Sequence, residues 1–180
     1  MQRLWAPWRM TYIKGDDSQE QTGSGCIFCD KVAENRDEEN LILARAERCF
    51  VIMNLYPYNN GHLMIAPYAH LPGIQQLDAP TLTEVMTTAQ KCLTALGATM
   101  GPQGYNIGIN QGAVAGAGIA DHMHVHIVPR WNGDTNFMPV LADVKVMPDF
   151  LANTYQQIRK ELTPLMAAPA KTRRSHARHT

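Results

Sequence analysis

The chain has 180 residues, and its 16 Lys and Arg balance its 16 Asp and Glu, which gives a formal net charge of zero. This length suits a single domain whose core can bury most of its apolar surface. The even balance of charge excludes a global basic field that would concentrate nucleic acid or an anionic membrane surface. No apolar run is long enough to span a membrane and no signal-peptide core is present, so we expect a soluble, cytoplasmic protein with no nucleic-acid or membrane partner.

Composition divides the chain into three regions. Residues 1–25 form an N-terminal arm that contains Trp5 and Trp8 and ends in a polar loop, and we expect this arm to pack on the domain or on a second subunit. Residues 26–162 carry the hydrophobic pattern of one domain. Residues 163–180 contain four basic and no acidic residues and are interrupted by prolines, which predicts a basic, disordered tail.

Short apolar segments predict five strands. They cover residues 41–44, 50–53, 62–67, 105–109 and 123–127. Between the second and third strands, residues 54–61 are rich in turn-forming residues and predict a hairpin. Pro129 is expected to end the last strand.

Helical spacing of apolar residues predicts two helices. The first begins at the capping residue Asp78 and is expected to end where Gly97 and Gly101 occur. The second covers residues 148–162 and is expected to stop before Pro164. Strands in antiparallel runs with helices added to them indicate an α+β architecture rather than a doubly wound parallel sheet.

Residues 121–130 carry the most informative motif, because His122, His124 and His126 occur at every second position. On a strand, residues at this spacing share one surface, while the intervening apolar residues point to the core. Three imidazoles on one surface favour a functional role over a packing role. They suit metal ligation, or an imidazole that serves as nucleophile and proton carrier.

Residues 101–118, directly before the histidines, contain six of the 13 glycines of the chain. Glycine allows close backbone approach and positive φ, which lets successive N–H groups converge on phosphate oxygens. Glycine-rich loops are common, and most of them bind nothing. A loop of this kind that runs directly into the histidine strand predicts an anion cradle beside a nucleophile.

Cys26 and Cys29 are separated by two residues, a spacing that lets both thiolates reach one zinc ion. Two further ligands are needed, and His70 and His122 are the candidates. A redox pair and incidental thiols are the alternatives, although the strand-to-helix context of a redox pair is not evident. The other two cysteines fall in apolar segments and are expected in the core.

The chain from Cys26 to the last expected helix resembles the histidine triad superfamily of nucleotidyl hydrolases and transferases. Its motif, His-x-His-x-His followed by two apolar residues, is highly specific. Further segments resemble the diadenosine tetraphosphate phosphorylase branch, namely residues 4–13, 54–59, 112–116, 128–131, 134–137 and 145–148. The resemblance implies an antiparallel sheet with two main helices, a two-fold homodimer, and cleavage of a dinucleoside polyphosphate or another purine nucleotide.

The resemblance also implies roles for individual residues. His124 is the nucleophile that attacks the α-phosphate of a nucleotide, and His126 contacts that phosphate or orients His124. Asn54 contacts the ribose, and His62 lies near the reacting phosphate. Asn110 matches a family position that contacts the transferred phosphate.

A zinc site and one departure from the family pattern follow from the same resemblance. Some bacterial relatives hold zinc with residues that correspond to Cys26, Cys29, His70 and His122, the four that spacing suggests. Many relatives carry Ser or Thr four residues before the first triad histidine, where this chain has Gly118. The hydroxyl contact to phosphate is therefore missing, and only a backbone N–H can serve there.

These assignments predict covalent catalysis in which a neutral His124 attacks, the polyphosphate portion leaves, and a second nucleophile resolves the nucleotidyl-His124 intermediate. Inorganic phosphate as acceptor makes a phosphorylase, which we favour. Water makes a hydrolase of dinucleoside polyphosphates or nucleoside phosphoramidates. Backbone N–H groups of Gly112, Gly116 and Gly118, together with His126, would stabilise charge on the phosphate. Mg²⁺ or Mn²⁺ can accompany the polyphosphate, and zinc would be structural.

Two alternatives remain open. In one, His122, which completes the predicted catalytic triad, joins His124 and a distant histidine to hold a catalytic zinc ion that activates water. In the other, the protein is a non-catalytic nucleotide-binding module. The intact triad weighs against this second alternative.

Overall fold

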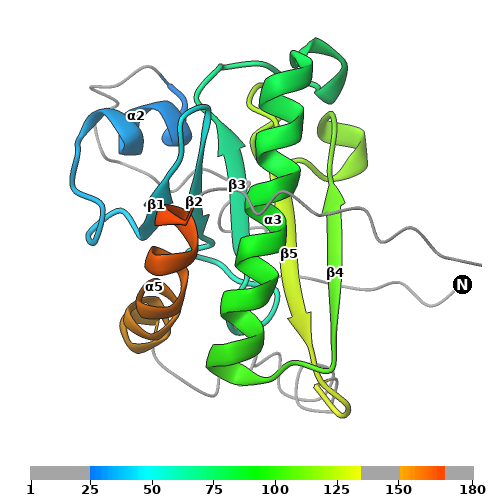
Figure 1. Cartoon of the computed structure of the whole chain (residues 1–180). Helices are drawn as coiled ribbons and strands as arrows, with labels where there is room; N and C mark the ends of the chain where they lie inside the picture. Colours follow the sequence, from blue (N-terminus) through cyan, green and yellow to red (C-terminus); the bar gives the residue numbers. More distant parts are fainter. Residues whose placement is uncertain (1–24, 135–150, 169–180) are drawn as a thin grey trace, which may run out of the picture.

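The computed structural model describes residues 25–134 and 151–168 of the chain. Its centre is a five-stranded antiparallel sheet with the strand order β1-β2-β3-β5-β4 (Figure 1). The strands are β1 Ile42–Arg45, β2 Cys49–Met53, β3 Leu63–Pro67, β4 Gly104–Ile109 and β5 Val125–Arg130. The helices of the described ranges are α2 Ile27–Ala33, α3 Ala79–Met100 and α5 Leu151–Ala167, with 3₁₀ turns η1 Ile74–Gln76 and η2 Ala113–Ala115.

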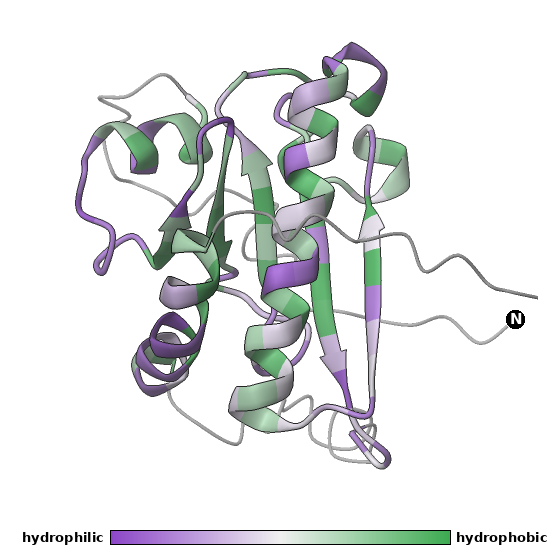
Figure 2. Cartoon of the chain, viewed as in Figure 1, coloured by the Kyte–Doolittle hydropathy of each residue, from purple (hydrophilic) through white to green (hydrophobic). Residues whose placement is uncertain are grey.

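The buried side chains form two cores, one on each face of the sheet, because successive residues of a strand point to opposite faces. On one face, Val51 and Ile127 pack with side chains of α3 and α5. On the other face, Phe50 and Ile52 pack with Phe28 of α2. Figure 2 shows hydrophobic residues along β3, which is buried throughout, and hydrophilic residues on turns of α5.

The α+β architecture and the antiparallel sheet are confirmed, and all five expected strands are present. Cys49 and Cys92 lie in the core between α3 and the sheet, as expected from their apolar segments. Burial raises the pKa of Cys49 to about 11 and the pKa of Cys92 to about 12. Both thiols therefore stay protonated at neutral pH and act as packing groups.

Helix α3 continues past Gly97, the first of its two expected ends. Asp78 caps its start by accepting a hydrogen bond from the N–H three residues later, at 2.9 Å. The helix continues past Gly97 and ends at Gly101, which adopts φ 53°. A Cβ at Gly97 would lie 3.7 Å from the hydroxyl of Tyr105, which donates to the carbonyl of Leu93. Gly97 thus lies where the β4 side chain packs on the helix, and the expectation that it ends the helix was wrong.

Two prolines do not end their elements, contrary to expectation. Pro164 lies inside α5, which continues to Ala167, because in the last turn its missing N–H removes only one intrahelical hydrogen bond. Residues 163–167, expected in the disordered tail, are therefore helical. Pro129 lies within β5, beyond the point where pairing with β3 stops at Ile127, so its nitrogen is not needed for that ladder. The rest of the tail and the expected helix start at residue 148 lie outside the described residues.

Helix α2 was not expected from the sequence. It has seven residues, and Cys26 before it makes no side-chain capping hydrogen bond. The usual start signal is therefore absent, and the helix is held by tertiary packing of Phe28, which is fully buried. None of the helices in the described ranges is long and apolar enough to cross a membrane.

Candidate active site and metal centre

The three histidines of the motif lie on the face of the sheet opposite α3 and α5. The intervening apolar residues belong to the core that α3 and α5 form with the sheet, called the α3–α5 core below. Only His126 lies within β5, so the expectation that one strand carries all three was wrong. His122 and His124 precede the strand because Met123 donates its N–H to the carbonyl of Leu71, at 2.7 Å, instead of pairing with β3.

His124 is 4% exposed, and its hydrogen bond defines which ring nitrogen carries the proton. Nδ1 lies 2.9 Å from the backbone carbonyl oxygen of His122. A carbonyl oxygen only accepts, so Nδ1 donates, and the neutral ring then has its lone pair on Nε2. Burial lowers the pKa of His124, which favours this neutral form. The ring of Phe28 packs against it with a centroid separation of 4.9 Å.

His62 and His126 form a second pair of imidazoles. His62 is fully buried, and its Nδ1 accepts a hydrogen bond from the backbone N–H of Tyr58 at 3.1 Å. Its Nε2 lies 3.0 Å from Nδ1 of His126. Because Nδ1 of His62 accepts, a neutral His62 carries its proton on Nε2 and donates to His126. The structure thus brings His62 next to His126. The ring centroid of His126 lies 4.7 Å from that of His124.

Asn54 lies at the start of the hairpin between β2 and β3, and its side chain is tied to that hairpin. Its Oδ1 accepts from the backbone N–H of Tyr56 at 2.9 Å, and its Nδ2 lies 3.3 Å from Nδ1 of His62. Asn54 is half-buried. The residue expected to contact the ribose therefore also helps to hold His62.

The glycine-rich segment forms strand β4 and the loop around η2. Gly112 and Gly116 flank η2 with φ of 82° and 85°, conformations that side chains with a Cβ rarely adopt. Asn110 donates from Nδ2 to the carbonyl of Gly116 at 3.4 Å. Gly108 lies opposite His126 in the β4–β5 ladder, and a Cβ there would meet nothing within 4 Å. The space beside the histidine pair is therefore open on the β4 side.

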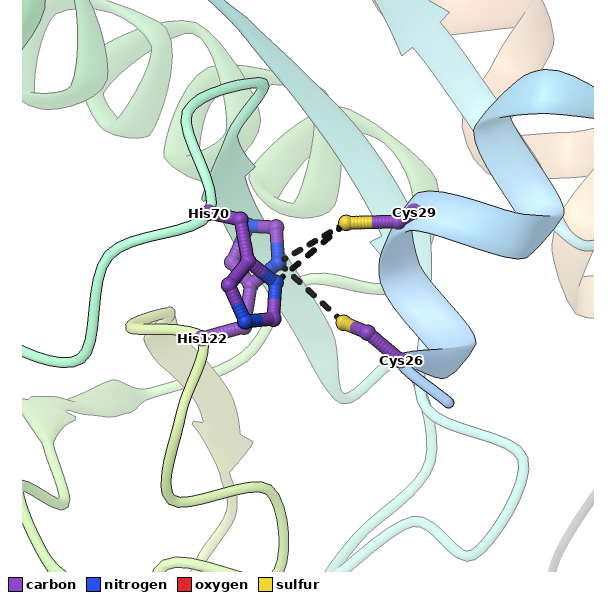
Figure 3. Close-up of side chains that lie close together, drawn as sticks. All are labelled: Cys26, Cys29, His70 and His122. Atoms are coloured by element: carbon purple, nitrogen blue, oxygen red, sulfur yellow. Dashed lines mark hydrogen bonds between the residues drawn. The ribbon is translucent and has the colours of Figure 1, made fainter. Parts of the chain in front are cut away.

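Three segments of the chain bring four possible metal ligands together (Figure 3). The start of α2 supplies Cys26 and Cys29, the segment after β3 supplies His70, and the segment before β5 supplies His122. One ligand atom from each residue lies within 4.8 Å of all the others. Nδ1 of His122 lies 3.3 Å from Sγ of Cys26 and 3.6 Å from Sγ of Cys29. Nδ1 of His70 lies 3.4 Å from Sγ of Cys29.

This donor set fits a tetrahedral zinc ion. Zn–S and Zn–N bonds of usual length place sulfur and nitrogen ligands about 3.6 Å apart at the tetrahedral angle. The nitrogen of His122 that faces the thiols is also the unprotonated one, because Nε2 donates to the carbonyl of Pro67 at 2.8 Å. Burial lowers the pKa of His122, which keeps its ring neutral, as metal ligation requires.

The cluster is close to the surface. A hollow of ≈ 340 Å³ borders it, lined by Cys26, His70 and residues 118–121 among others. His70 is exposed, whereas His122 is buried. A metal ion or a chelator can therefore approach the cluster from the His70 side, and Gly118 lines the same hollow.

Two aromatic residues of the site were not singled out by the sequence. Phe28 packs on both His122 and His124, with centroid separations of 5.2 and 4.9 Å. Tyr58 lies against His62 and stacks on His126, with separations of 4.7 and 5.9 Å. Phe28 falls between the two cysteines and Tyr58 within the turn-rich hairpin, so proximity to those motifs is the signal that could have found them.

A family model described as HIT domain matches residues 35–133, and the chain belongs to this family. The sequence is also 36% identical over 164 residues to the AP-4-A phosphorylase of Mycobacterium tuberculosis (strain H37Rv), covering 89% of this chain and 84% of the relative. It is 30% identical over 93 residues to the asymmetrical bis(5'-nucleosyl)-tetraphosphatase of Schizosaccharomyces pombe, covering 52% and 50% of the two chains. The family and the branch that the motifs resemble are thereby confirmed.

Solved structures of the same family have the same fold. A Zn-bound histidine triad family protein from Mycobacterium smegmatis matches with a TM-score of 0.63 and 25% identity, over 78% of this chain and 95% of that one. A hypothetical histidine triad nucleotide-binding protein from Sulfolobus tokodaii matches with a TM-score of 0.61 and 25% identity, over 78% and 91%. The expected HIT-like fold is therefore confirmed.

Proposed function

We propose that this protein is a nucleotidyltransferase that cleaves a dinucleoside polyphosphate through a covalent nucleotidyl-His124 intermediate. The observation that carries the proposal is the placement of His124, which is buried and held at Nδ1 by the carbonyl of His122, so that the neutral ring has its lone pair on Nε2. The names of two relatives, AP-4-A phosphorylase and bis(5'-nucleosyl)-tetraphosphatase, support the substrate class.

In the first step, the Nε2 lone pair of His124 attacks the α-phosphorus and a P–N bond forms. The bond from phosphorus to the bridging oxygen of the polyphosphate breaks, and that oxygen takes the electron pair. Attack turns the ring into a cation, and the carbonyl of His122 stabilises this cation because it already accepts from Nδ1. In the second step an acceptor oxygen attacks phosphorus, the P–N bond breaks, and the neutral ring is restored.

The negative charge that develops on the α-phosphate oxygens needs donors close to His124. His126 is the first candidate, because its Nδ1 accepts from His62 and a neutral ring then carries its proton on Nε2. Asn110 and the backbone N–H groups of Gly112, Gly116 and Gly118 are the other proposed donors. The positive φ at Gly112 and Gly116 supports an N–H cradle in this loop.

We further propose inorganic phosphate as the acceptor, which yields a nucleoside diphosphate, since the phosphorylase of M. tuberculosis matches most of this chain. Water as acceptor yields a nucleoside monophosphate and is the second candidate. The asymmetrical tetraphosphatase, which shares 30% identity over a shorter segment, supports that candidate.

We propose that Cys26, Cys29, His70 and His122 hold a structural zinc ion. When bound, zinc would cross-link α2, the segment after β3 and the segment before β5, with a closed set of four ligands and no open position for substrate. The orientation of His122 disfavours a catalytic zinc shared with His124, because Nδ1 faces the thiols and Nε2 donates to Pro67. Within the described ranges this is the one group of three or more His, Cys and acidic residues that could hold a metal. We also propose that Mg²⁺ or Mn²⁺ can accompany the polyphosphate of the substrate.

A homodimer in the cytoplasm is the assembly that we propose. Strand β4 is an edge of the sheet. Two apolar side chains are exposed here: Ile107 on β4 is 46% exposed, and Met86 on α3 is 51% exposed. An exposed edge strand next to apolar side chains supports pairing with a second copy. Light scattering should give twice the chain mass, and the Ile107→Asp variant should shift the protein toward a monomer.

Product identification tests the reaction. The enzyme is incubated with diadenosine tetraphosphate, with and without inorganic phosphate, and the products are separated by anion exchange. Phosphate-dependent ADP plus ATP supports the phosphorylase, and AMP plus ATP regardless of phosphate supports the hydrolase. Absence of turnover by the zinc-loaded protein in both arms would leave the chain as a nucleotide-binding module and overturn the proposal.

A further inference from the structure

Asp134, which follows β5, lies at the centre of a group of hydrogen bonds outside the histidine site. Its carboxylate accepts from Nε and Nη2 of Arg130 at 2.7 and 2.9 Å, and from the backbone N–H of Trp131 at 3.2 Å. It also accepts from Nδ2 of Asn59 at 2.9 Å. Only 10% of the Asp134 side chain is exposed. The carboxylate therefore joins the end of β5 to the hairpin between β2 and β3.

Asn59 is fixed at further points of this junction. Its Nδ2 donates to the carbonyl of Pro129 in β5 at 3.1 Å, in addition to Asp134. Its backbone carbonyl accepts from the N–H of His62 at 3.2 Å. The two bonds from Nδ2 tie the hairpin to the end of β5, and the bond from His62 ties Asn59 to the residue directly before β3.

Tyr58, next to Asn59, determines which ring nitrogen of His62 carries the proton. The backbone N–H of Tyr58 donates to Nδ1 of His62, and Nε2 of His62 is 3.0 Å from Nδ1 of His126. A shift of the hairpin would displace the Tyr58 N–H, which is the shorter of the two contacts at Nδ1 (the other is Asn54 Nδ2), and allow His62 to exchange its proton between the two nitrogens. The proton on Nε2 of His126 depends on the same hydrogen bond.

We propose that Asp134 is a positioning residue, which acts through Asn59 to hold the hairpin so that His62 keeps His126 in the tautomer that donates from Nε2. This inference deepens the proposed function and rests on it for the contact between His126 and phosphate. Neither Asp134 nor Asn59 reaches His124 by any hydrogen bond in the described part of the chain, so both act at a distance from the proposed nucleophile.

Asp37 offers a matched control. Its Oδ1 accepts from Nε and Nη2 of Arg45 at 3.0 and 2.8 Å, and its Oδ2 accepts from Nε at 3.2 Å, so the same two arginine nitrogens bind this carboxylate as in the pair between Asp134 and Arg130. It lies between α2 and β1, and its hydrogen-bond partners in the described chain do not include the histidine site. A variant at Asp37 therefore removes a comparable ion pair without touching the 54–61 hairpin.

Imidazole nitrogen spectra of the full, zinc-loaded chain labelled with ¹⁵N-histidine test the inference without substrate. In the wild type we expect His62 and His126 each to show an unprotonated Nδ1 and a protonated Nε2. Asp134→Ala and Asn59→Ala should move both rings toward averaged signals, while His124 keeps its protonated Nδ1. Asp37→Ala should leave all three rings unchanged.

Steady-state kinetics provide the second readout. Displacement of a group that contacts the reacting phosphate lowers kcat, so Asp134→Ala should reduce kcat by about tenfold or more. The KM for diadenosine tetraphosphate should change by less than about threefold, because Asp134 does not contact the nucleotide. Asp134→Asn keeps an acceptor oxygen for Asn59 and should restore most of kcat.

The outcomes separate this inference from the proposed function. Unchanged His62 and His126 signals in Asp134→Ala, or an equal loss of kcat in Asp37→Ala, would overturn the positioning role even if the wild type is active. A wild type with no nucleotide turnover would overturn the proposed function, while averaged tautomers in Asp134→Ala would still support the link from Asp134 to His126. Thermal unfolding of each variant identifies any loss of signal that is caused by misfolding.

Discussion

His122 holds His124 through its backbone while its own ring faces the cysteines. The carbonyl of His122 accepts from Nδ1 of His124 at 2.9 Å, and Nδ1 of His122 lies 3.3 Å from Sγ of Cys26. His122 thus connects the candidate metal centre, through its ring, with the proposed nucleophile His124, through its carbonyl. A disturbance of the cluster should reach His124 through the His122 peptide, without any change in a residue that contacts substrate.

Replacement of His124 by Ala tests the nucleophile. We expect kcat to fall by at least about 10³-fold, as is usual when a covalent nucleophile is removed. The affinity for diadenosine tetraphosphate should remain close to that of the wild type. Rapid-quench mass spectrometry should detect added adenylate mass on the wild type and none on His124→Ala.

His126→Ala is the matched control for this experiment, because it removes a neighbouring imidazole and leaves Nε2 of His124 in place. This variant should still form the adenylated species, although more slowly. Brisk consumption of dinucleotide by the wild type with no adduct at any time would contradict covalent catalysis.

Substitution of the cluster tests zinc. Cys29→Ser and His70→Ala should each lower bound zinc, measured by elemental analysis, below one ion per chain. A chelator should lower the Tm of the wild type, since zinc that is a hundredfold above its dissociation constant stabilises the folded state by about 3 kcal/mol. The Tm should recover when zinc is restored.

Cys92→Ala is the control for the cluster variants. Cys92 is fully buried in the α3–α5 core, so its loss should reduce stability and leave zinc content unchanged. Full zinc content in Cys29→Ser would show that this thiol is not a ligand.

Tyr155 links α5 to the first strand, and its removal tests that junction. Its buried hydroxyl donates to the carbonyl of Ile42 at 2.9 Å. Tyr155→Phe should reduce the free energy of unfolding by about 1 kcal/mol, because the carbonyl loses a buried partner. Urea denaturation should show a lower midpoint with an unchanged m-value, and a midpoint equal to that of the wild type would contradict this role.

The cap of α3 predicts a pH dependence of stability. The hydrogen bonds from Thr81 lower the pKa of Asp78, so its contribution to stability is fully present above the ordinary pKa of a carboxyl group. This contribution is lost as the pH falls through the lowered value. Asp78→Ala should therefore be less stable than the wild type at pH 7, and the difference should narrow in acid.

Asp78→Asn separates the cap from its charge. Asn also accepts at an N-cap and does not titrate, so this variant should stay close to the wild type at pH 7. Urea midpoints measured from pH 7 to pH 2.5 give the comparison. An equal difference between wild type and Asp78→Ala at every pH would contradict a titrating cap.

Local patterns predicted the strands, and they singled out the four cysteine and histidine residues that the fold brings together. The two-residue spacing of Cys26 and Cys29 and the alternation of the histidines are short-range patterns, and the structure brings Cys26, Cys29, His70 and His122 together. His70 lies 41 residues from Cys29, outside the Cys-x-x-Cys pattern itself, and the family resemblance implies the same residue.

Features that depend on tertiary contacts were not predictable. Helix α2 has no capping signal and is held by the packing of Phe28. Gly97 lies inside α3 with the Tyr105 hydroxyl 3.7 Å from where its Cβ would be, and Pro164 falls in a last turn where one lost hydrogen bond is tolerated. The link from Asn59 to Asp134 spans 75 residues and has no local pattern.

The separation of the two faces of the sheet has a practical consequence for handling the protein. The histidines and the cysteine–histidine cluster are on one side, while α5, with the exposed Lys160, is on the other. A linker attached through position 160 would immobilise the molecule on a sensor chip or bead with its histidine side directed into the liquid. Attachment at this position would leave the histidine face accessible to small phosphorylated molecules in solution.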